Sequence, residues 1–366
     1  MMNREGLNKR YTLKILGITG AAGLVAACFS SPKPVEPAPT LPAQASCPTP
    51  AAIDNGFSVI DLDIDVHLSP REPWNPNSPL ARNLDKVGRL LPGLADVDPT
   101  GILKGTELAS SFPSNMGVET WPVIHHEWDV KLPLADRDFL NTFGEEVKRL
   151  VSDYPGVVLD FEGENRDVGQ MFEVVRTIKE KNPNKNIGLD IYANATEWGG
   201  PNSKNINMLY AMTYGQSGVE WGNQMDQATL DHPDAYQGIS WQEKELANLE
   251  KAGISPNNLS LGISTGGLKW TRDGTTWQRE EVNRSEIMGN MGKGDYSYVE
   301  TTTYGDVRER RLENTAGDTQ YRFLDSDGQD LLARGKMAKG LGLNSLFVWH
   351  GNEIPEGWFS VMRKVR

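Results

Sequence analysis

The residues of this chain best placed to do chemistry lie at 156–164, where the sequence reads GVVLDFEGE. A continuous apolar run after Pro155 and Gly156 is typical of a strand buried on both faces in a parallel sheet. Side chains alternate along a strand, so Asp160 and Glu162 point to the same side, roughly 6.5–7 Å apart. Two carboxylates at the end of a buried strand are costly to desolvate without a use, and active sites form where barrel strands end. The segment therefore predicts a pair of catalytic carboxylates.

The segments around these acids alternate between strand-like and helix-like patterns. Short apolar runs are separated by stretches in which apolar residues recur at helical spacing, such as Phe139, Phe143 and Val147. This alternation is typical of βα units and a parallel sheet, so an α/β fold is expected. Residues 68–118 are rich in Pro, Asn and Gly and predict no clear element. The expected strands are 57–67, 120–128, 156–162, 187–192, 208–214, 259–264 and 346–349, and the expected helices are 138–153, 169–181, 241–252 and 329–339.

Two of these strands carry possible metal ligands. In 57–67 the residues Asp61, Asp63 and Asp65 alternate with apolar residues, and three aligned acids could bind a hard cation. The favoured interpretation is a half-exposed strand whose acids face water. In 120–128 the side chains of His125 and Glu127 could share a metal site, whereas a cleft-lining or packing role is favoured. No metal and no cofactor are therefore expected.

The acidic segment resembles the catalytic strand of glycoside hydrolase family 18, the chitinases and their relatives, whose motif is D-x-x-D-x-D-x-E. Aligned on the last acid, Glu162 takes the glutamate position and Asp160 the aspartate two residues before it. Pro155 and Val158 stand where the two earlier aspartates of the motif would be. A shift of the alignment by two residues would make Glu164 the acid, but the aromatic residue before Glu162 and the glycine after it favour Glu162.

Further segments resemble the family in the order that it requires. Met212–Tyr214 is similar to its Met-x-Tyr-Asp strand end, with Gly215 in place of the aspartate. The strand at 259–263 and the closing segment Lys339–Trp349 are similar as well. The resemblance runs from near Thr120 to Trp349 and implies a (β/α)8 TIM barrel. It also implies a small insertion before the last strand, formed by residues between Leu268 and Tyr321.

The resemblance implies a role for each matching residue. Glu162 would protonate the glycosidic oxygen, while Asp160 would orient the N-acetyl group whose carbonyl oxygen attacks the anomeric carbon in place of an enzyme nucleophile. Tyr214 would hydrogen-bond the same acetamido group. Trp349 would form the apolar floor beneath the reacting sugar, with Met212 beside it.

Four more tryptophans are candidate substrate-binding residues. Trp198, Trp221, Trp270 and Trp277 follow expected strands and so belong to the loops at the barrel mouth. Aromatic faces stack on the apolar faces of sugars, which would make these residues subsite platforms. For each of them, core or loop packing remains an equal alternative.

The implied function is glycosidase activity (EC 3.2.1 class) of the chitinase type. The expected partner is an N-acetylglucosamine-containing polysaccharide or oligosaccharide, chitin first, cleaved at β-1,4 bonds by the substrate-assisted retaining mechanism. Peptidoglycan fragments and N-glycan cores need the same acetamido chemistry and remain open. Because Val158 and Gly215 remove polar groups that the family carries, a lectin-like, carbohydrate-binding barrel without turnover is the alternative from another class. Metal-dependent hydrolysis at His125 and Glu127 is a third possible function.

The N-terminus predicts export. Basic residues precede an apolar stretch that ends in small residues, which is typical of a signal peptide at 1–27, and Leu24–Cys28 resembles a bacterial lipobox. We therefore expect lipidation of Cys28, a Pro-rich tether at 28–52, a barrel domain at 53–366, and a place in the bacterial cell envelope, at the outer membrane or the cell surface. The net charge of −12 argues against nucleic acid and anionic lipid as partners. Membrane contact through the anchor alone and a monomer are expected.

Overall fold

The computed structural model describes ten stretches of the chain: residues 60–69, 73–112, 116–126, 130–161, 167–192, 195–214, 224–226, 237–274, 276–300 and 309–363. The chain divides into two units, 1–55 and 56–366, and every described residue belongs to the second. The expected signal peptide, Cys28 and the whole tether at 28–52 therefore lie outside the described residues. In the described part of the chain, no helix combines the length and the hydrophobicity that a membrane span requires.

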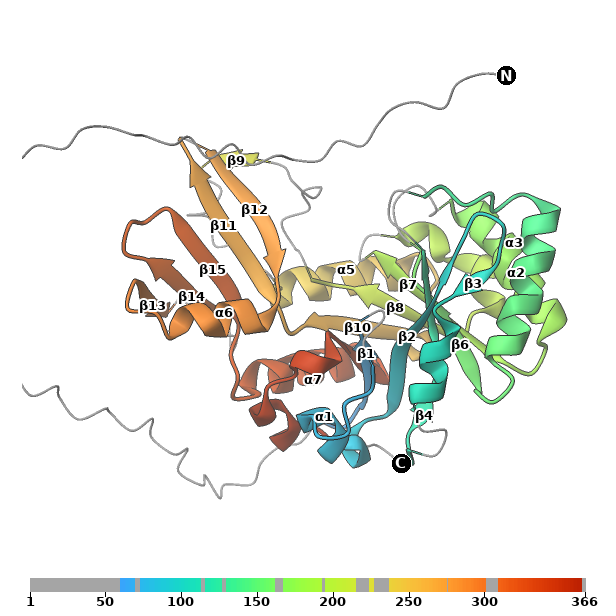
Figure 1. Ribbon diagram of the computed structural model, residues 1–366, viewed down its shortest axis with the longest axis horizontal. Coiled ribbons are helices and arrows are strands. Elements are labelled where there is room, and N and C mark those ends of the chain that lie inside the picture. The colour runs from blue at the N-terminus through green and yellow to red at the C-terminus, as the bar shows by residue number, and fades with distance from the viewer. Residues whose placement is uncertain are drawn as a thin grey trace, which may run out of the picture. The chain divides into compact units, whose positions relative to one another are not determined.

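A closed barrel of parallel strands forms the centre of the second unit (Figure 1). In barrel order its strands are β1 (Asp63–Leu68), β2 (Arg89–Val97), β5 (Val123–His126), β6 (Gly156–Leu159), β7 (Asn186–Tyr192), β8 (Met208–Met212), β10 (Leu259–Ser264) and β16 (Ser345–Trp349). The barrel closes because β1 pairs in parallel with both β2 and β16. The two-residue strands β3 (Leu103–Lys104) and β4 (Glu119–Thr120) extend the sheet at β2. The predicted TIM barrel is confirmed, and β2 lies in the region for which no element was predicted.

The four predicted helices occur where the pattern places them. α2 (Arg137–Leu150) begins at Asp136, whose carboxylate accepts hydrogen bonds from the backbone N–H groups of Asp138 and Phe139. α3 (Val168–Lys181) begins in the same way at Asp167. The other two are α5 (Ile239–Lys251) and α7 (Gln329–Gly340), whereas α1 (Pro79–Arg82) and α6 (Arg284–Met291) were not predicted. Short 3-10 turns lie at Leu84–Lys86, Thr106–Ser111, Thr196–Trp198, Gly200–Asn205, Pro256–Asn258, Gly351–Glu353 and Glu356–Ser360.

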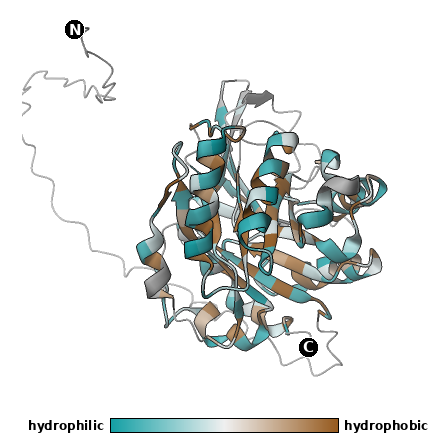
Figure 2. Cartoon of the chain, turned by 90° about the vertical axis from the view of Figure 1, so that its right-hand side faces the viewer, coloured by the Kyte–Doolittle hydropathy of each residue, from teal (hydrophilic) through white to brown (hydrophobic). Residues whose placement is uncertain are grey.

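The main hydrophobic core lies between the outer face of the barrel and its helices. Ile64, Val157 and Leu189 point outward from their strands and are at most 1% exposed, and Phe143 and Val147 of α2 pack in the same cluster. Figure 2 shows helices that are hydrophilic on their outer side, over strands that are largely hydrophobic. Burial of this apolar layer drives the βα units to close around the barrel.

An antiparallel sheet is inserted between β10 and α7. Its strands, in order, are β13 (Tyr296–Glu300), β14 (Glu309–Asn314), β15 (Thr319–Leu324), β11 (Gly267–Asp273), β12 (Thr276–Val282) and β9 (Gln224–Asp226). This sheet, with α6, confirms the predicted insertion before the last strand. β9 lies in the segment between β8 and α5, so the loop after β8 also contributes a strand to this sheet.

Candidate active site at the C-terminal mouth of the barrel

The interior of the barrel is filled by side chains that point inward at alternate positions of each strand. An apolar cluster occupies its middle and contains Leu91, Val123, Val158, Tyr210 and Phe347. Val158, which replaces an acid of the family motif, is completely buried in this cluster. The polar side chains inside the barrel therefore separate into two layers, one on each side of the apolar cluster.

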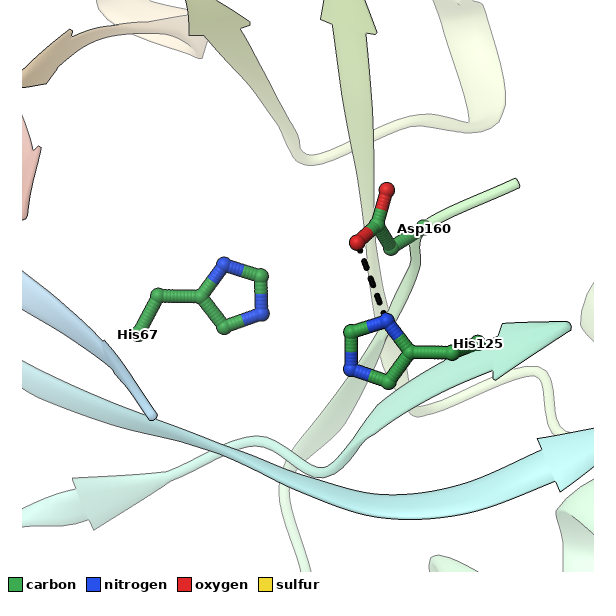
Figure 3. Close-up of side chains that lie close together, drawn as sticks. All are labelled: His67, His125 and Asp160. Atoms are coloured by element: carbon green, nitrogen blue, oxygen red, sulfur yellow. Dashed lines mark ion pairs between the residues drawn. The ribbon is translucent and has the colours of Figure 1, made fainter. Parts of the chain in front are cut away.

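The upper layer lies at the C-terminal ends of the strands, where active sites of TIM barrels are built. His67 of β1, His125 of β5 and Asp160 after β6 point toward one another (Figure 3). Nδ1 of His125 lies 3.0 Å from Oδ2 of Asp160, and Nδ1 of His67 lies 3.6 Å from Oδ2 of Asp190 on β7. The pairing of Ile124 with Leu159 sets the first of these contacts, because the next residue of each strand then lies side by side.

Burial dominates the electrostatics of this layer. It lowers the pKa of His67 from 6.5 to about 3, although the carboxylate of Asp160 opposes the shift, so the ring is neutral near pH 7. The ring of Trp349 meets His67 edge-on at a centroid distance of 4.6 Å. Burial also lowers the pKa of His350, the next residue, to about 4, while its Nδ1 lies 2.5 Å from the hydroxyl of Ser69. The layer thus combines two neutral histidines, His67 and His350, with the carboxylates of Asp160 and Asp190.

The structure brings together four of the residues predicted from the sequence. Asp160 lies directly after β6 with a side chain that is 11% exposed. Met212 ends β8 and is buried, and Tyr214 lies two residues further on, half-buried against Phe347 at a centroid distance of 6.3 Å. Trp349 ends β16 and remains partly exposed. These residues all lie at the same end of the barrel.

The remaining predicted residues fall into two groups. Glu162, Trp221 and Cys28 lie outside the described residues, as do Glu127, Glu164 and Gly215. Trp198 is 6% exposed and packs edge-on against Phe172 of α3 at 5.1 Å, which favours core packing over a sugar platform. Trp270 of β11 is 5% exposed and packs with Leu268 and Trp277, next to Tyr214. For both tryptophans the structure favours the packing alternative.

The lower layer consists of a buried ion pair and its neighbours. Asp65 of β1 is fully buried, and its Oδ2 lies 3.3 Å from Nη1 of Arg89 on β2. Arg89 also donates to the hydroxyl of Tyr210 at 3.1 Å and lies 5.0 Å above the ring of Trp121, which donates in turn to Glu119 at 2.7 Å. Burial raises the pKa of Asp65 to about 7, against the lowering effect of Arg89.

The expectation that the acids of the first strand face water is wrong for Asp65. The apolar residues that alternate with it, such as Ile64 and Val66, are covered from outside, and the acid points into the barrel. Asp61, before the strand, and Asp63, its first residue, are both partly exposed, and Asp61 pairs with Lys339 and Arg363. Because Arg89 lies in the region without predicted elements, its partnership with Asp65 could not be expected from the sequence.

Two site residues were missed by the reasoning from sequence. His67 closes the first strand, and Asp190 interrupts the apolar run of β7. A polar residue at the C-terminal end of an otherwise buried strand was the available signal, the same signal that identified Asp160. The pairing of His125 with Glu127 was also considered for a metal, whereas the structure places His125 against Asp160 and near His67.

Comparisons with solved structures agree with this architecture. A family 18 chitinase from Cycas revoluta, in complex with (GlcNAc)4, has a TM-score of 0.62 with 16% identity, over 81% of this chain and 99% of that one. The barrel has the fold of glycoside hydrolase family 18. The Bacillus cereus spore cortex-lytic enzyme SleL has a TM-score of 0.63 with 13% identity over 83% of this chain and 74% of that one. A family 18 N-acetylglucosaminidase from Paenibacillus barengoltzii has a TM-score of 0.61 with 11% identity over 82% and 98%.

Sequence comparison alone does not detect these similarities. No protein-family model matches the chain, and no curated protein is significantly similar to it. At identities of 10–16%, the solved structures share the fold with this chain, and the roles of individual residues must be argued from its own geometry.

Proposed function

We propose that this protein is a glycoside hydrolase that cleaves β-1,4-linked N-acetylglucosamine glycans by the substrate-assisted retaining mechanism. The observation that carries the proposal is the position of Asp160. Its carboxylate lies inside the barrel mouth, directly after the fourth barrel strand, and contacts Nδ1 of His125 at 3.0 Å. The fold shared with family 18 enzymes supports the same reaction class, and the (GlcNAc)4 complex of the Cycas revoluta chitinase supports an N-acetylglucosamine oligosaccharide as ligand.

In this mechanism Asp160 orients the acetamido group of the bound sugar and offsets the positive charge that develops on it. A carboxylate does this best in a site without bulk water, because electrostatic interactions are stronger there. His125 contacts this carboxylate. At the position where the family motif has another aspartate, this chain has Val158, which lies inside the barrel. A histidine next to Asp160 can hold the carboxylate in place without adding a second negative charge.

Two further residues fit the same assignment. The half-buried side chain of Tyr214 lies beyond the end of β8, where its hydroxyl could reach the acetamido group. Trp349, partly exposed at the end of β16, offers an apolar surface for the sugar ring. The proton donor of the proposal is Glu162, two residues after Asp160 and outside the described residues.

The test is hydrolysis of a fluorogenic chitooligosaccharide by wild-type protein, Glu162→Gln and Asp160→Asn. We expect turnover by the wild type and a loss of roughly 10²–10³ in kcat for either variant, comparable to the removal of one key electrostatic group. Glu250→Gln, on the exposed side of α5, is the matched control and should keep full activity. If the wild-type protein binds the oligosaccharide but does not hydrolyse it, the result contradicts the glycosidase and favours the lectin-like alternative.

The glycan of bacterial cell envelopes is the second candidate substrate. One of the similar structures is a spore cortex-lytic enzyme, which favours peptidoglycan among the remaining acetamido-containing glycans. Release of soluble fragments from purified peptidoglycan, compared with release from colloidal chitin by the same preparation, distinguishes the two substrates.

We also propose that lipidation of Cys28 anchors the enzyme to the bacterial cell envelope. The lipobox-like segment before this cysteine and the Pro-rich stretch after it support the proposal. Wild-type protein should partition into the detergent phase of a Triton X-114 extract, and Cys28→Ala should move it to the aqueous phase. Aqueous partitioning of both proteins would contradict the anchor.

A further inference from the structure

The upper layer of the barrel contains the elements of a metal site in addition to those of a glycosidase. His67, His125 and Asp160 each offer one ligand atom, and these atoms all lie within 4.8 Å of one another. The three side chains come from three different barrel strands or their ends and converge on one point (Figure 3). Their side chains are only 2%, 9% and 11% exposed.

His67 is placed as metal ligands often are, with its Nδ1 3.6 Å from Oδ2 of Asp190, a carboxylate outside the cluster. His125 instead contacts Asp160, which is itself a member of the cluster, with its Nδ1 3.0 Å from Oδ2. The Nε2 atoms of both rings are buried and have no hydrogen-bond partner among the residues that the structure describes. A carboxylate at one ring nitrogen orients a histidine and raises the basicity of the other nitrogen, which then binds the metal.

Alternative uses of these nitrogens are less consistent with the surroundings. A buried nitrogen without a partner is costly, and most such groups in proteins are satisfied by protein, water or ligand. The two rings face each other with a centroid distance of 5.9 Å and an angle of 14° between their planes, so they do not bond each other directly.

The donor set determines the class of ion. Two imidazole nitrogens and one carboxylate oxygen suit Zn²⁺ and related transition metals, whereas Ca²⁺ and Mg²⁺ prefer oxygen alone. Ligand atoms around a tetrahedral zinc ion lie about 3.3 Å apart, as follows from bonds of about 2.0–2.1 Å. The three ligand atoms of this site lie within 4.8 Å of one another, so the side chains must rotate to close around an ion.

We propose that His67, His125 and Asp160 bind one divalent transition-metal ion such as Zn²⁺, with a fourth position open to water or to a substrate oxygen. Three protein ligands and one exchangeable position are common for zinc in accessible sites. One consequence rests on the proposed function: Asp160 cannot bind the ion and orient an acetamido group at the same time. Zn²⁺ would then inhibit hydrolysis, and oligosaccharide would compete with the ion.

Calorimetric titration of the chelator-treated, full-length protein with ZnCl2 tests the site without any assay of hydrolysis. We expect one ion per chain, and we expect His67→Gln and His125→Gln each to weaken binding by about tenfold or more. The control is His126→Gln, because His126 is the neighbouring residue on β5 and packs on the other side of the strand, against Phe161 at 5.7 Å. Titration with CoCl2 adds a visible absorption band that reports nitrogen and oxygen coordination.

The folded state of each variant is checked by circular dichroism, so that a failure to fold is not mistaken for a lost ligand. Absence of zinc binding by the wild type, or equal affinity of the folded His67→Gln and His125→Gln variants, would overturn the proposal. Failure of the glycosidase is a separate result, since the protein would then bind zinc normally but hydrolyse no oligosaccharide at any zinc concentration. Conversely, hydrolysis that is insensitive to zinc, together with no calorimetric signal, leaves the glycosidase intact and removes the metal site.

Discussion

The two polar layers inside the barrel share strand β1 but differ in how their charges are satisfied. In the lower layer the carboxylate of Asp65 lies 3.3 Å from Arg89, which also donates to Tyr210, so opposite charges offset each other, although both Asp65 oxygens lack a hydrogen-bond partner among the described residues. In the upper layer the histidines contact carboxylates through one nitrogen, and their other nitrogens lack a hydrogen-bond partner among the same residues. The difference between the layers is therefore the counter-charge, an arginine in the lower layer and histidine rings in the upper one.

The position of each layer along the strands agrees with this difference. His67 lies two residues after Asp65 on the same strand, so both side chains point into the barrel at different heights. The upper layer is at the C-terminal ends, where loops can bring in a substrate, and the lower layer is closed off by the apolar cluster. We therefore expect substitutions in the upper layer to change function and those in the lower layer to change stability.

The largest effect on function is expected from Asp160→Asn. The substitution keeps the size of the side chain but removes the charge that, in the proposed mechanism, stabilises the developing oxazolinium ion, so kcat on a chitooligosaccharide should fall by roughly 10²–10³. The midpoint of thermal unfolding should change little. Asp153→Asn, an exposed residue after α2, is the matched control. If Asp160→Asn instead lost much stability and kept a normal kcat, the upper layer would have the structural role that we assign to the lower layer.

In the lower layer, Arg89→Met should destabilise the fold. It leaves Asp65 buried without its counter-charge, and removal of one partner of a buried ion pair costs about 3 kcal/mol in the free energy of unfolding. Urea denaturation measures the loss. The double variant Asp65→Leu/Arg89→Met should recover much of it, because the remaining charge is gone. Equal stabilities of the single and double variants would show that the pair is not coupled.

The pH dependence of stability should differ between the layers, and Asp65 determines it in the lower one. The pKa of Asp65 is about 7 in the folded state and 3.8 for an ordinary aspartate, as in the unfolded chain, so the folded state binds the proton more tightly. Its contribution is present below pH 3.8 and is lost as the pH rises toward 7, with a slope of at most about 1.4 kcal/mol per pH unit. Asp65→Asn should remove this slope in urea titrations between pH 4 and about 7.

At the barrel mouth, His350 should give the opposite slope. Burial lowers its pKa from 6.5 to about 4, so the unfolded chain takes up the proton more readily. Its contribution to stability is present above pH 6.5 and is lost as the pH falls toward 4. His350→Asn should flatten the acid side of the stability profile. An unchanged profile would mean that the ring is already protonated in the folded protein.

The order of the elements could be predicted from the sequence because it depends on local patterns. β10 was predicted with its observed bounds, 259–264, and the helix predicted at 169–181 became α3 at Val168–Lys181. Asp160 was identified by its place at the end of an apolar run. The strand at Arg89–Val97 was missed, since its run is interrupted by Pro92 and Gly93 and is surrounded by loop-forming residues.

Local patterns of the sequence therefore predicted the alternating strands and helices and the carboxylate at the end of β6, and the resemblance to family 18 predicted the eight-stranded barrel and the insertion before its last strand. Only the tertiary structure decided which face of β1 is the interior, and hence that Asp65 pairs with Arg89 instead of facing water. It also decided that His67 and His125 share one site, although β2 lies between their strands in the barrel. The physical reason is that alternation along a strand is a local pattern, which shows only which side chains lie on the same face of the strand. Closure of the barrel brings together residues that are far apart in the chain, and it determines whether that face contacts solvent or other side chains.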